Sequence, residues 1–361
     1  MRHYILRRLL LMLPTMFGIM AISFALVQFA PGGPIERIIA QLEGTQHSGV
    51  GRMSGGSDAG FAAPAGGETY RGAQGLDPAF IAELEQQFGF DQPAHIRFIR
   101  MLGNYLRFDF GTSYYRDIAV LDLILQKLPV SISLGLWVTL LTYLISIPLG
   151  IAKARRHGAR FDVWTSAVIV VGYAIPGFLF AVLLIVLFAG GSYWDIFPLR
   201  GLTSDDWEQL SLLGKIGDYL WHIFLPVLSL SLGAFATMTL LAKNSFLEEM
   251  NKHYVMLARA KGAAAPRVLY FHVFRNAMLI IIAGFPSAFV SAFFTGSLLI
   301  ETIFSLDGLG LLSYESILNR DYPVVFASLY IFGLLGLVIT LISDLVYALV
   351  DPRIDFAVRH G

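Results

Sequence analysis

The stretch MNKHYVMLARAKGAAAPRVLYFHVFRNA, residues 250–277, decides how the rest of the chain is interpreted. It is basic and rich in alanine, and on each side it is flanked by an apolar run of about 20 residues, which is long enough to cross a bilayer. A membrane protein that returns such a segment to its positively charged side presents a surface to a soluble partner.

The spacing within this stretch predicts a helix over Glu248–Ala260 that ends at Gly262, and a second helix with Pro266 in its first turn that runs to about His272. The centre is a low-relief knob of small residues: Ala258, Ala260, Gly262, Ala263, Ala264 and Ala265. Three basic side chains ring it: Arg259, Lys261 and Arg267. Such a knob fits a groove on a partner protein. The alternative is a basic linker held against anionic lipid headgroups.

The composition places the chain in a membrane. Hydrophobic residues make up 56% and charged residues 14% of the 361 residues, and the mean hydropathy is +0.64, all outside the range of soluble domains. Runs that can span a bilayer as helices lie at 9–30, 130–152, 163–189, 220–242, 278–300 and 324–350. Backbone groups in lipid must be satisfied within their own segment, so an all-α protein with six transmembrane helices is predicted.

Lys and Arg mark the cytoplasmic side of a membrane protein. They gather in alternate segments, at Arg2, Arg7 and Arg8, at Lys153, Arg155, Arg156 and Arg160, at Lys243, Lys252, Arg259, Lys261, Arg267 and Arg275, and at Arg353 and Arg359. Loop 190–219 is acidic instead. Both termini are therefore predicted to be cytoplasmic. Run 9–30 exceeds the core of a cleavable signal, about 7–15 residues, and is expected to be retained as the first helix.

The domain division follows from these runs. We expect a cytoplasmic end and first helix over 1–31, a periplasmic segment over 32–129, a core of five helices over 130–350 with a cytoplasmic loop at 246–275, and a cytoplasmic tail over 351–361. Residues 44–75 contain ten glycines and are expected to be flexible. From Asp77 a helical pattern begins. This external helix either touches a soluble partner, caps a pore, or packs on the helix ends.

Several functions are excluded by what the chain lacks. It has no cysteine, its eight histidines are scattered singly, and Gly214 and Lys215 are followed by Ile216, where a phosphate-binding loop needs Ser or Thr. A metal site is not expected; the net charge of zero by itself says nothing of nucleic acid, which is not among the expected partners. Any ATP that drives this protein must be bound by another subunit. A secondary transporter and an intramembrane enzyme remain as alternatives, although neither a buried acid at mid-membrane nor a catalytic spacing supports them.

Prolines and hydroxyl groups mark particular places in the helices. Pro148 in the second run, and Gly172 with Pro176 and Gly177 in the third, are expected to kink or loosen those helices. Small residues recur at helical spacing in the fifth and sixth runs, where helix packing is the simplest interpretation. Candidate pore-lining residues are Ser229, Ser231, Ser291 and Thr295, with an internal hydrogen bond to the preceding turn as the alternative for each.

The motifs resemble a known family. YVMLARAKG followed by HVFRNA is similar to the cytoplasmic loop of ABC-importer permeases of the oligopeptide and dipeptide type, whose general signature is Glu-Ala-Ala, three residues, Gly, nine residues and Ile-x-Leu-Pro. Ala258 and Gly262 match it. The departures are Met256, Leu257, His272, Phe274 and Arg275. ISFALVQFAPGGP (22–34), FGFDQP (88–93), FDFGTSY (108–114), KLPVSISLGL (127–136), FSLDGLG (304–310), RDYPVV (320–325) and LVDPRID (349–355) resemble the B-type permease of this family.

The resemblance implies a type I ABC-importer permease fold in the bacterial inner membrane and a subunit that is not itself an enzyme. It implies a heterodimer with a second, homologous permease, ATPase subunits that bind ATP and Mg²⁺, and a periplasmic binding protein that delivers oligopeptides, including peptides of the microcin C type. The loop that couples to the ATPase would then contain Ala258, Arg259, Ala260, Lys261, Gly262, Ala263, Pro266 and Arg267. ATP-driven closure of the ATPases would move this loop and switch access to the pore.

Overall fold

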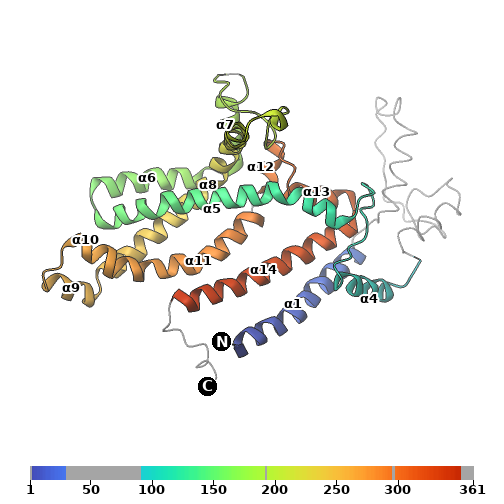
Figure 1. Cartoon of the computed structure of the whole chain (residues 1–361), viewed down its shortest axis with the longest axis horizontal. Coiled ribbons are helices and arrows are strands. Elements are labelled where there is room, and N and C mark those ends of the chain that lie inside the picture. The colour runs from blue at the N-terminus through green and yellow to red at the C-terminus, as the bar shows by residue number, and fades with distance from the viewer. Residues whose placement is uncertain (1, 30–90, 192, 295–296, 351–361) are drawn as a thin grey trace, which may run out of the picture. The chain divides into compact units, whose positions relative to one another are not determined.

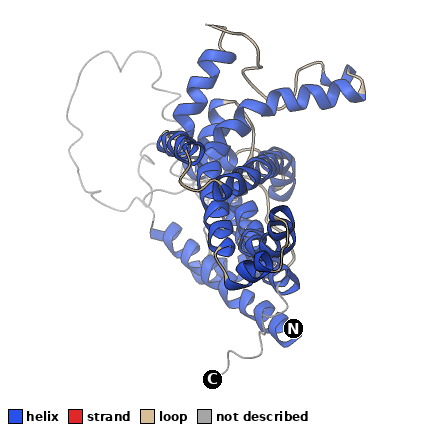
Figure 2. Ribbon diagram, turned by 90° about the vertical axis from the view of Figure 1, so that its left-hand side faces the viewer, coloured by secondary structure: helices blue, strands red, loops and turns tan. Residues whose placement is uncertain are grey.

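The computed structural model describes residues 2–29, 91–191, 193–294 and 297–350, and these are helical almost throughout (Figures 1 and 2). The helix predicted from Asp77, the glycine-rich stretch 44–75 and the tail 351–361 lie outside the described residues. Within the described ranges, five helices are long and apolar enough to span a membrane, and a bent pair of helices makes a sixth span if it is counted as one. The all-α class and the expected number of spans agree with this arrangement.

The five long spans lie where the apolar runs predicted them, with different ends. They are α1 (Arg2–Phe29), α5 (Val120–Arg155), α8 (Leu212–Met250), α11 (Phe274–Phe294) and α14 (Tyr322–Val350). α5 and α8 begin ten and eight residues before the predicted runs, because charged residues in these first turns, Asp122 and Lys127 in α5 and Lys215 and Asp218 in α8, lie outside a search for uncharged apolar runs. The fifth predicted run, 278–300, covers most of α11 and the start of α12 (Ser297–Ile303), and residues 295 and 296 between them lie outside the described residues.

The third predicted run is not one straight helix. α6 (Arg160–Ala174) and α7 (Gly177–Phe188) meet at an angle of 95°. Ile175 takes an extended conformation with φ −83° and ψ 120°, as the residue before Pro176 is expected to do. The expected kink at Pro176 is thus confirmed as a full break. By contrast, α5 continues through Pro148, and a kink or loosening there stays a prediction.

Contact clustering divides the chain into two compact units. The first comprises Met1–Leu10, Gln126–Leu312 and Leu335–Gly361. In it α8 packs against α6, α7 and α11. One buried cluster joins α5, α7, α8 and α12 through Leu134, Leu184, Leu225 and Ile300. A second lies at the other end of α8, around Phe246, and includes Ala154 of α5 and Ala277 of α11.

A buried carboxylate closes the turn after α12 in this first unit. Glu301 Oε2 accepts a hydrogen bond of 2.7 Å from the backbone N–H of Leu311, in the first turn of α13 (Leu309–Asn319). A Cβ on Gly308 would lie 2.5 Å from this carboxyl group, so only glycine fits there. Gly308 therefore leaves room for the buried Glu301 carboxyl group.

The second unit comprises Leu11–Leu125 and Ser313–Leu334. Asp321, at the corner between α13 and α14, is buried and accepts hydrogen bonds from Ser113 Oγ at 2.5 Å and from the Tyr114 N–H at 3.0 Å. Burial raises the pKa of the Asp321 carboxyl group. The short helix α4 (Ala94–Tyr105) lies beside α1 and buries Tyr105 against the rings of Phe110 and Tyr330.

Candidate functional site

The loop predicted as an interaction surface is a tight bend between two short helices. α9 (His253–Ala260) ends in Gly262, which has a φ of +83°. The Gly262 N–H donates to the Arg259 carbonyl at 2.9 Å, and the Ala263 N–H donates to the Ala258 carbonyl at 3.2 Å. These two bonds form a Schellman motif, in which glycine is favoured at the residue with positive φ. The prediction that Gly262 ends the helix is confirmed.

The two helices of the bend differ in extent from the prediction. Glu248–Met250 complete α8, and a break at Asn251–Lys252 precedes α9, so a single helix over Glu248–Ala260 is wrong. After the bend, α10 (Ala265–Arg267) holds Pro266 in its first turn, as predicted. This second helix does not stop at His272. It continues as the π-helix η3 (Val268–Val273) directly into α11, because buried Val268, Leu269 and Val273 anchor it to the cluster around Phe246.

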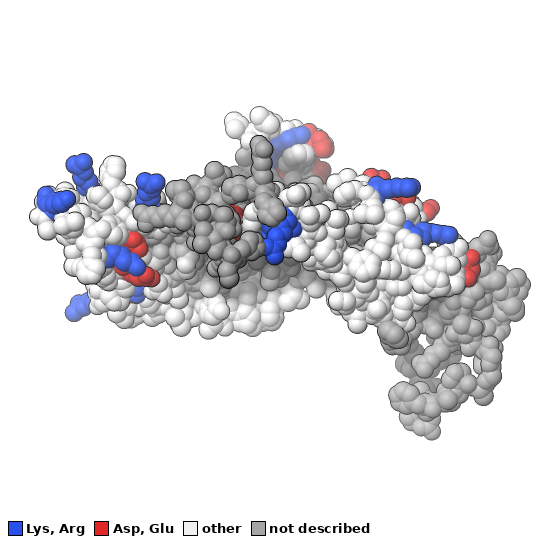
Figure 3. All heavy atoms as spheres, turned by 90° about the horizontal axis from the view of Figure 1, so that it is seen from below, with Lys and Arg blue, Asp and Glu red and all other residues white. Residues whose placement is uncertain are grey.

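The bend has one buried and one exposed side. Val255 of α9 and Val273 of η3 are fully buried beside Phe246, whereas Met256 is 49% and Leu257 57% exposed. Of the predicted loop residues, Ala258 and Ala263 are partly covered. Those that face outward are Arg259, Ala260, Lys261, Gly262, Pro266 and Arg267. We call the exposed side chains of residues 256–267 the bend surface. Figure 3 shows Lys and Arg side chains gathered at the end of the molecule that carries α9 and α10.

Tyr254 joins the bend to the two long helices beside it. Its hydroxyl donates to Glu249 Oε1 of α8 at 2.6 Å, lies 3.2 Å from the His272 carbonyl oxygen, and accepts from Asn276 Nδ2 of α11 at 3.0 Å. Partial burial, together with the hydrogen bond to the Glu249 carboxylate, raises the pKa of Tyr254 to about 12. The hydroxyl therefore stays protonated and bonded at neutral pH.

Replacing Tyr254 with Phe should loosen α9 while the fold is kept. One net hydrogen bond contributes about 1 kcal/mol, so amide hydrogen exchange of residues 253–260 is expected to quicken by about fivefold. Mass spectrometry of exchanged peptides measures this. Tyr270→Phe, on the exposed side of η3, is the matched control. Equal exchange in the two variants would show that the Tyr254 hydroxyl does not hold α9.

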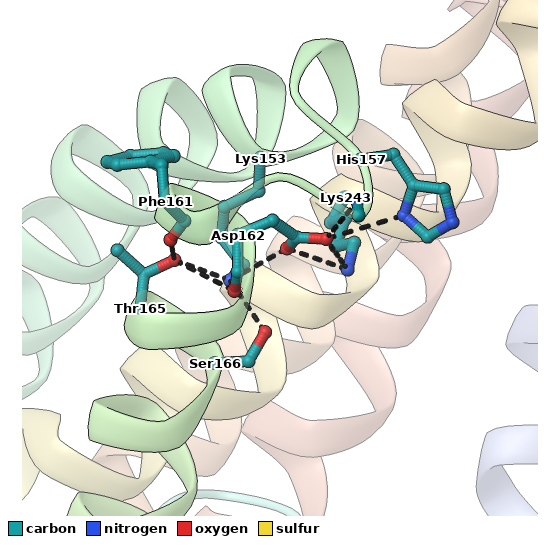
Figure 4. Close-up of polar contacts among 8 residues, drawn as sticks. Lys153, His157, Phe161, Asp162, Thr165, Ser166 and Lys243 are labelled. Atoms are coloured by element: carbon teal, nitrogen blue, oxygen red, sulfur yellow. Dashed lines mark hydrogen bonds and ion pairs between the residues drawn. The ribbon is translucent and has the colours of Figure 1, made fainter.

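A buried ionic cluster lies beside the bend and connects three helices (Figure 4). Lys153 of α5 is fully buried, and its Nζ lies 3.1 Å from Asp162 Oδ1 in α6. The same Nζ donates to the Asp162 carbonyl at 2.9 Å, to Thr165 Oγ1 at 2.7 Å and to Ser166 Oγ at 2.8 Å. Lys243 Nζ of α8 approaches Asp162 Oδ1 and Oδ2 at 2.8 Å each. One carboxylate thus serves two ammonium groups.

α5 and α8 touch backbone to backbone next to this cluster. A Cβ on Gly150 would lie 2.6 Å from the Ala242 Cβ, 2.9 Å from the Lys243 N and 3.0 Å from the Thr239 carbonyl oxygen. Only glycine permits that approach. Because Ala154 of α5 also belongs to the cluster around Phe246, the ends of α5 and α8 form the support on which the bend rests, and the ionic cluster joins α6 to them.

The sequence did not predict the ionic cluster. From the sequence, Lys153 is only one of the basic residues that mark the cytoplasmic side, and Asp162 is not singled out. The available signal was an aspartate in the first turn of a predicted helix, close to a run of basic residues. Nothing local distinguishes Lys153 from its exposed neighbours Arg155 and Arg156.

The structure describes the side chains of two of the four candidate pore-lining residues. Ser229 and Ser231 of α8 are buried, and their hydroxyls donate to the carbonyls of Leu225 at 2.8 Å and Val227 at 2.6 Å, which is the internal hydrogen bond foreseen as the alternative. The side chain of Ser291 and all of Thr295 lie outside the described residues. A pore-lining role of these four stays a prediction. Among the residues that the structure describes, no group of three or more His, Cys, Asp or Glu side chains is placed to hold a metal ion.

Comparisons with known proteins agree on one family. Residues 146–356 match the model of the binding-protein-dependent transport system inner membrane component. The peptidoglycan transport system permease protein YejB of Agrobacterium fabrum is 62% identical over 364 residues, covering 99% of this chain and 100% of that protein. The inner membrane ABC transporter permease protein YejB of Escherichia coli O157:H7 is 57% identical, and the oligopeptide transport system permease protein AppB of Bacillus subtilis 32%, each over 99% of this chain and the whole relative.

These matches run through the bend, the ionic cluster and nearly every membrane-spanning helix described above. They account for a multi-pass protein of the inner membrane with the type I permease fold. The chain belongs to the family of binding-protein-dependent transport system inner membrane components, as the permease subunit of an ABC importer.

Proposed function

We propose that this chain forms one half of a peptide-conducting pore and that a partner ATPase drives it by pressing on the bend surface. A second, homologous permease completes the pore as a heterodimer. The ATPase subunits bind ATP and Mg²⁺, and a periplasmic binding protein delivers the peptide. Both termini then lie in the cytoplasm, segment 32–129 lies in the periplasm, and the chain itself hydrolyses nothing.

One observation carries this proposal: the bend surface is exposed and low in relief, while its other side is buried against the membrane helices. Ala260, Gly262 and Pro266 offer little side-chain bulk, so a groove can close over them. Behind them, Val255, Val268 and Val273 pack on α8 and α11. A displacement of the bend must therefore displace these two helices, because packed interiors respond as bistable units rather than deforming continuously.

The substrate class rests on the relatives. Two permeases named YejB are 57–62% identical, one of them named for peptidoglycan transport, and AppB is named for oligopeptide transport. The chemistry common to these names is a short peptide, alone or attached to sugar. We therefore propose import of oligopeptides, including peptides released from peptidoglycan and peptides of the microcin C type.

Gly262 offers a direct test of the coupling. Gly262→Trp should lower peptide uptake by about tenfold or more, within the range of typical coupling free energies, while ATP turnover by the assembled complex continues. The bulky ring would occupy the space into which the ATPase groove must fit. Uptake of a labelled peptide by proteoliposomes that contain the complete importer, measured together with ATP hydrolysis, gives both readouts.

Gly262→Ala is the matched control. Both substitutions force a side chain into positive φ, which costs about 1–2 kcal/mol, and no atom lies within 4 Å of the added Cβ, so the two variants differ in bulk alone. Alanine should retain most of the uptake. Full uptake by the tryptophan variant at wild-type abundance would refute ATPase contact at the bend, and would favour a loop that lies against lipid.

A further inference from the structure

The helix α4 has two exposed faces of opposite character. Ile96, Ile99 and Leu106 follow one side at helical spacing, and Ile99 is 66% and Leu106 71% exposed. The adjoining side of the helix carries Arg100 and Asn104, with half-buried Arg97 at its edge and Arg107 two residues beyond the helix end, and the helix contains no acidic residue. An apolar face beside a purely basic face is typical of helices that lie in the plane of a membrane interface.

The contacts between α4 and α1 show where α4 lies along the membrane span of α1, and they do not depend on the distribution of apolar and basic residues. The Phe98 ring lies 5.8 Å from the ring of Phe17 and 5.2 Å from that of Phe24, both in the membrane span Tyr4–Gln28 of α1. Phe17 precedes the end of the span by 11 residues and Phe24 by four, or about 16 Å and about 6 Å of helix. Phe98 therefore lies beside the second half of this apolar span and not beyond its last residue.

Arg97 of α4 lies near the C-terminal end of the membrane span of α1. Its Nη2 donates to Gln28 Oε1 at 2.9 Å, and its guanidinium lies 6.0 Å from the centroid of Phe24. The Arg97 guanidinium is thus level with the last turn of the span, whereas the Phe98 ring reaches deeper. Interfacial helices place their charged side chains and their apolar face in this order.

We propose that α4 is an interfacial helix that binds the phospholipid leaflet at the C-terminal end of α1. Ile96, Ile99 and Leu106 lie among the acyl chains, and Arg100 and Arg107 bind headgroup phosphates. The distribution of Lys and Arg predicts that this leaflet is the periplasmic one. A soluble protein docked on the same apolar face is the competing occupant. The depth set by Phe98 and the absence of acidic residues from α4 favour lipid.

The chain lacks cysteine, so a single introduced cysteine carries a unique spin label. Ile99→Cys is labelled on the apolar face, and Asn104→Cys, on the basic face of the same helix, is the matched control. The full chain is placed in nanodiscs of phosphatidylethanolamine and phosphatidylglycerol, and collision rates with oxygen and with a water-soluble nickel chelate are measured. Oxygen collisions should exceed nickel collisions at residue 99, and the order should reverse at residue 104. Leu106→Cys, on the same face as Ile99, repeats the test if the first variant is unstable.

A second arm tests the arginines. Arg100→Gln combined with Arg107→Gln should reduce the excess of oxygen over nickel collisions at residue 99, because the headgroup contacts that hold the helix are lost. Nickel collisions that dominate at residues 99 and 106 would overturn the proposal. So would a label at residue 99 that becomes shielded only after the periplasmic binding protein is added. Since none of these readouts involves transport, they do not depend on the proposed function.

Discussion

The Asp162→Ala variant is expected to lose about 3–5 kcal/mol of stability, the range found when one member of a buried ion pair is removed. Asp162 supplies the carboxylate that Lys153 and Lys243 share. Without it, Lys153 keeps only uncharged oxygen acceptors, from residues 162, 165 and 166, around a fully buried ammonium group. Lys243 suffers less, because its side chain is 13% exposed and can reach water.

Thermal or detergent unfolding of the purified chain in nanodiscs measures this loss. Glu248→Gln removes one partner of an exposed ion pair, with Lys252, and should leave stability unchanged. Adding Lys153→Met to Asp162→Ala should restore part of the lost stability, since the unpaired buried charge is then gone. If this second substitution restores nothing, the loss does not come from an unpaired ammonium group, and the cluster lacks the role assigned to it.

The Gly150→Ala variant is expected to lose about 1–3 kcal/mol, the usual cost of overpacking. Two of the three atoms that the new Cβ would meet belong to the backbone of α8, at Thr239 and Lys243. They cannot rotate away as a side chain would. α5 must therefore separate from α8 at the level of the ionic cluster, and less folded protein should reach the membrane.

Gly233→Ala is the control for Gly150→Ala. Gly233 also lies inside a membrane-spanning helix, and no atom lies within 4 Å of an added Cβ there. Alanine at Gly233 should therefore be tolerated. Ala242→Gly, which removes the atom nearest to the new Cβ, should rescue Gly150→Ala in part. Equal stability of the two alanine variants in the same unfolding assay would show that the approach of α5 to α8 is looser than the structure indicates.

The predictions from sequence succeeded where the physical rule acts on neighbouring residues. Apolar runs of spanning length located the membrane helices, because burial in lipid depends on the average of about 20 consecutive side chains. Gly262 ended α9 because positive φ is a property of a single residue. Pro266 opened the second helix of the bend for the same kind of reason.

They failed where the outcome depends on distant partners. Local sequence did not tell which proline would end a helix, since α5 continues through Pro148 whereas the chain turns by 95° at Pro176. No local sequence pattern predicted that the Tyr254 hydroxyl would form hydrogen bonds with both Glu249 and Asn276. Lys153 resembled its basic neighbours in sequence and differs from them only in what surrounds it.

The sequence by itself determined that the protein lies in a membrane, the approximate position of its spans and the site of its bend, because hydropathy and φ preferences are properties of contiguous residues. Only the tertiary structure decided which charges are buried and what the bend rests on. Asp162 and Lys243 stand 81 residues apart, and α5 approaches α8 only because Gly150 meets Ala242 across two packed helices. Such pairings depend on packing in three dimensions, which no local pattern encodes.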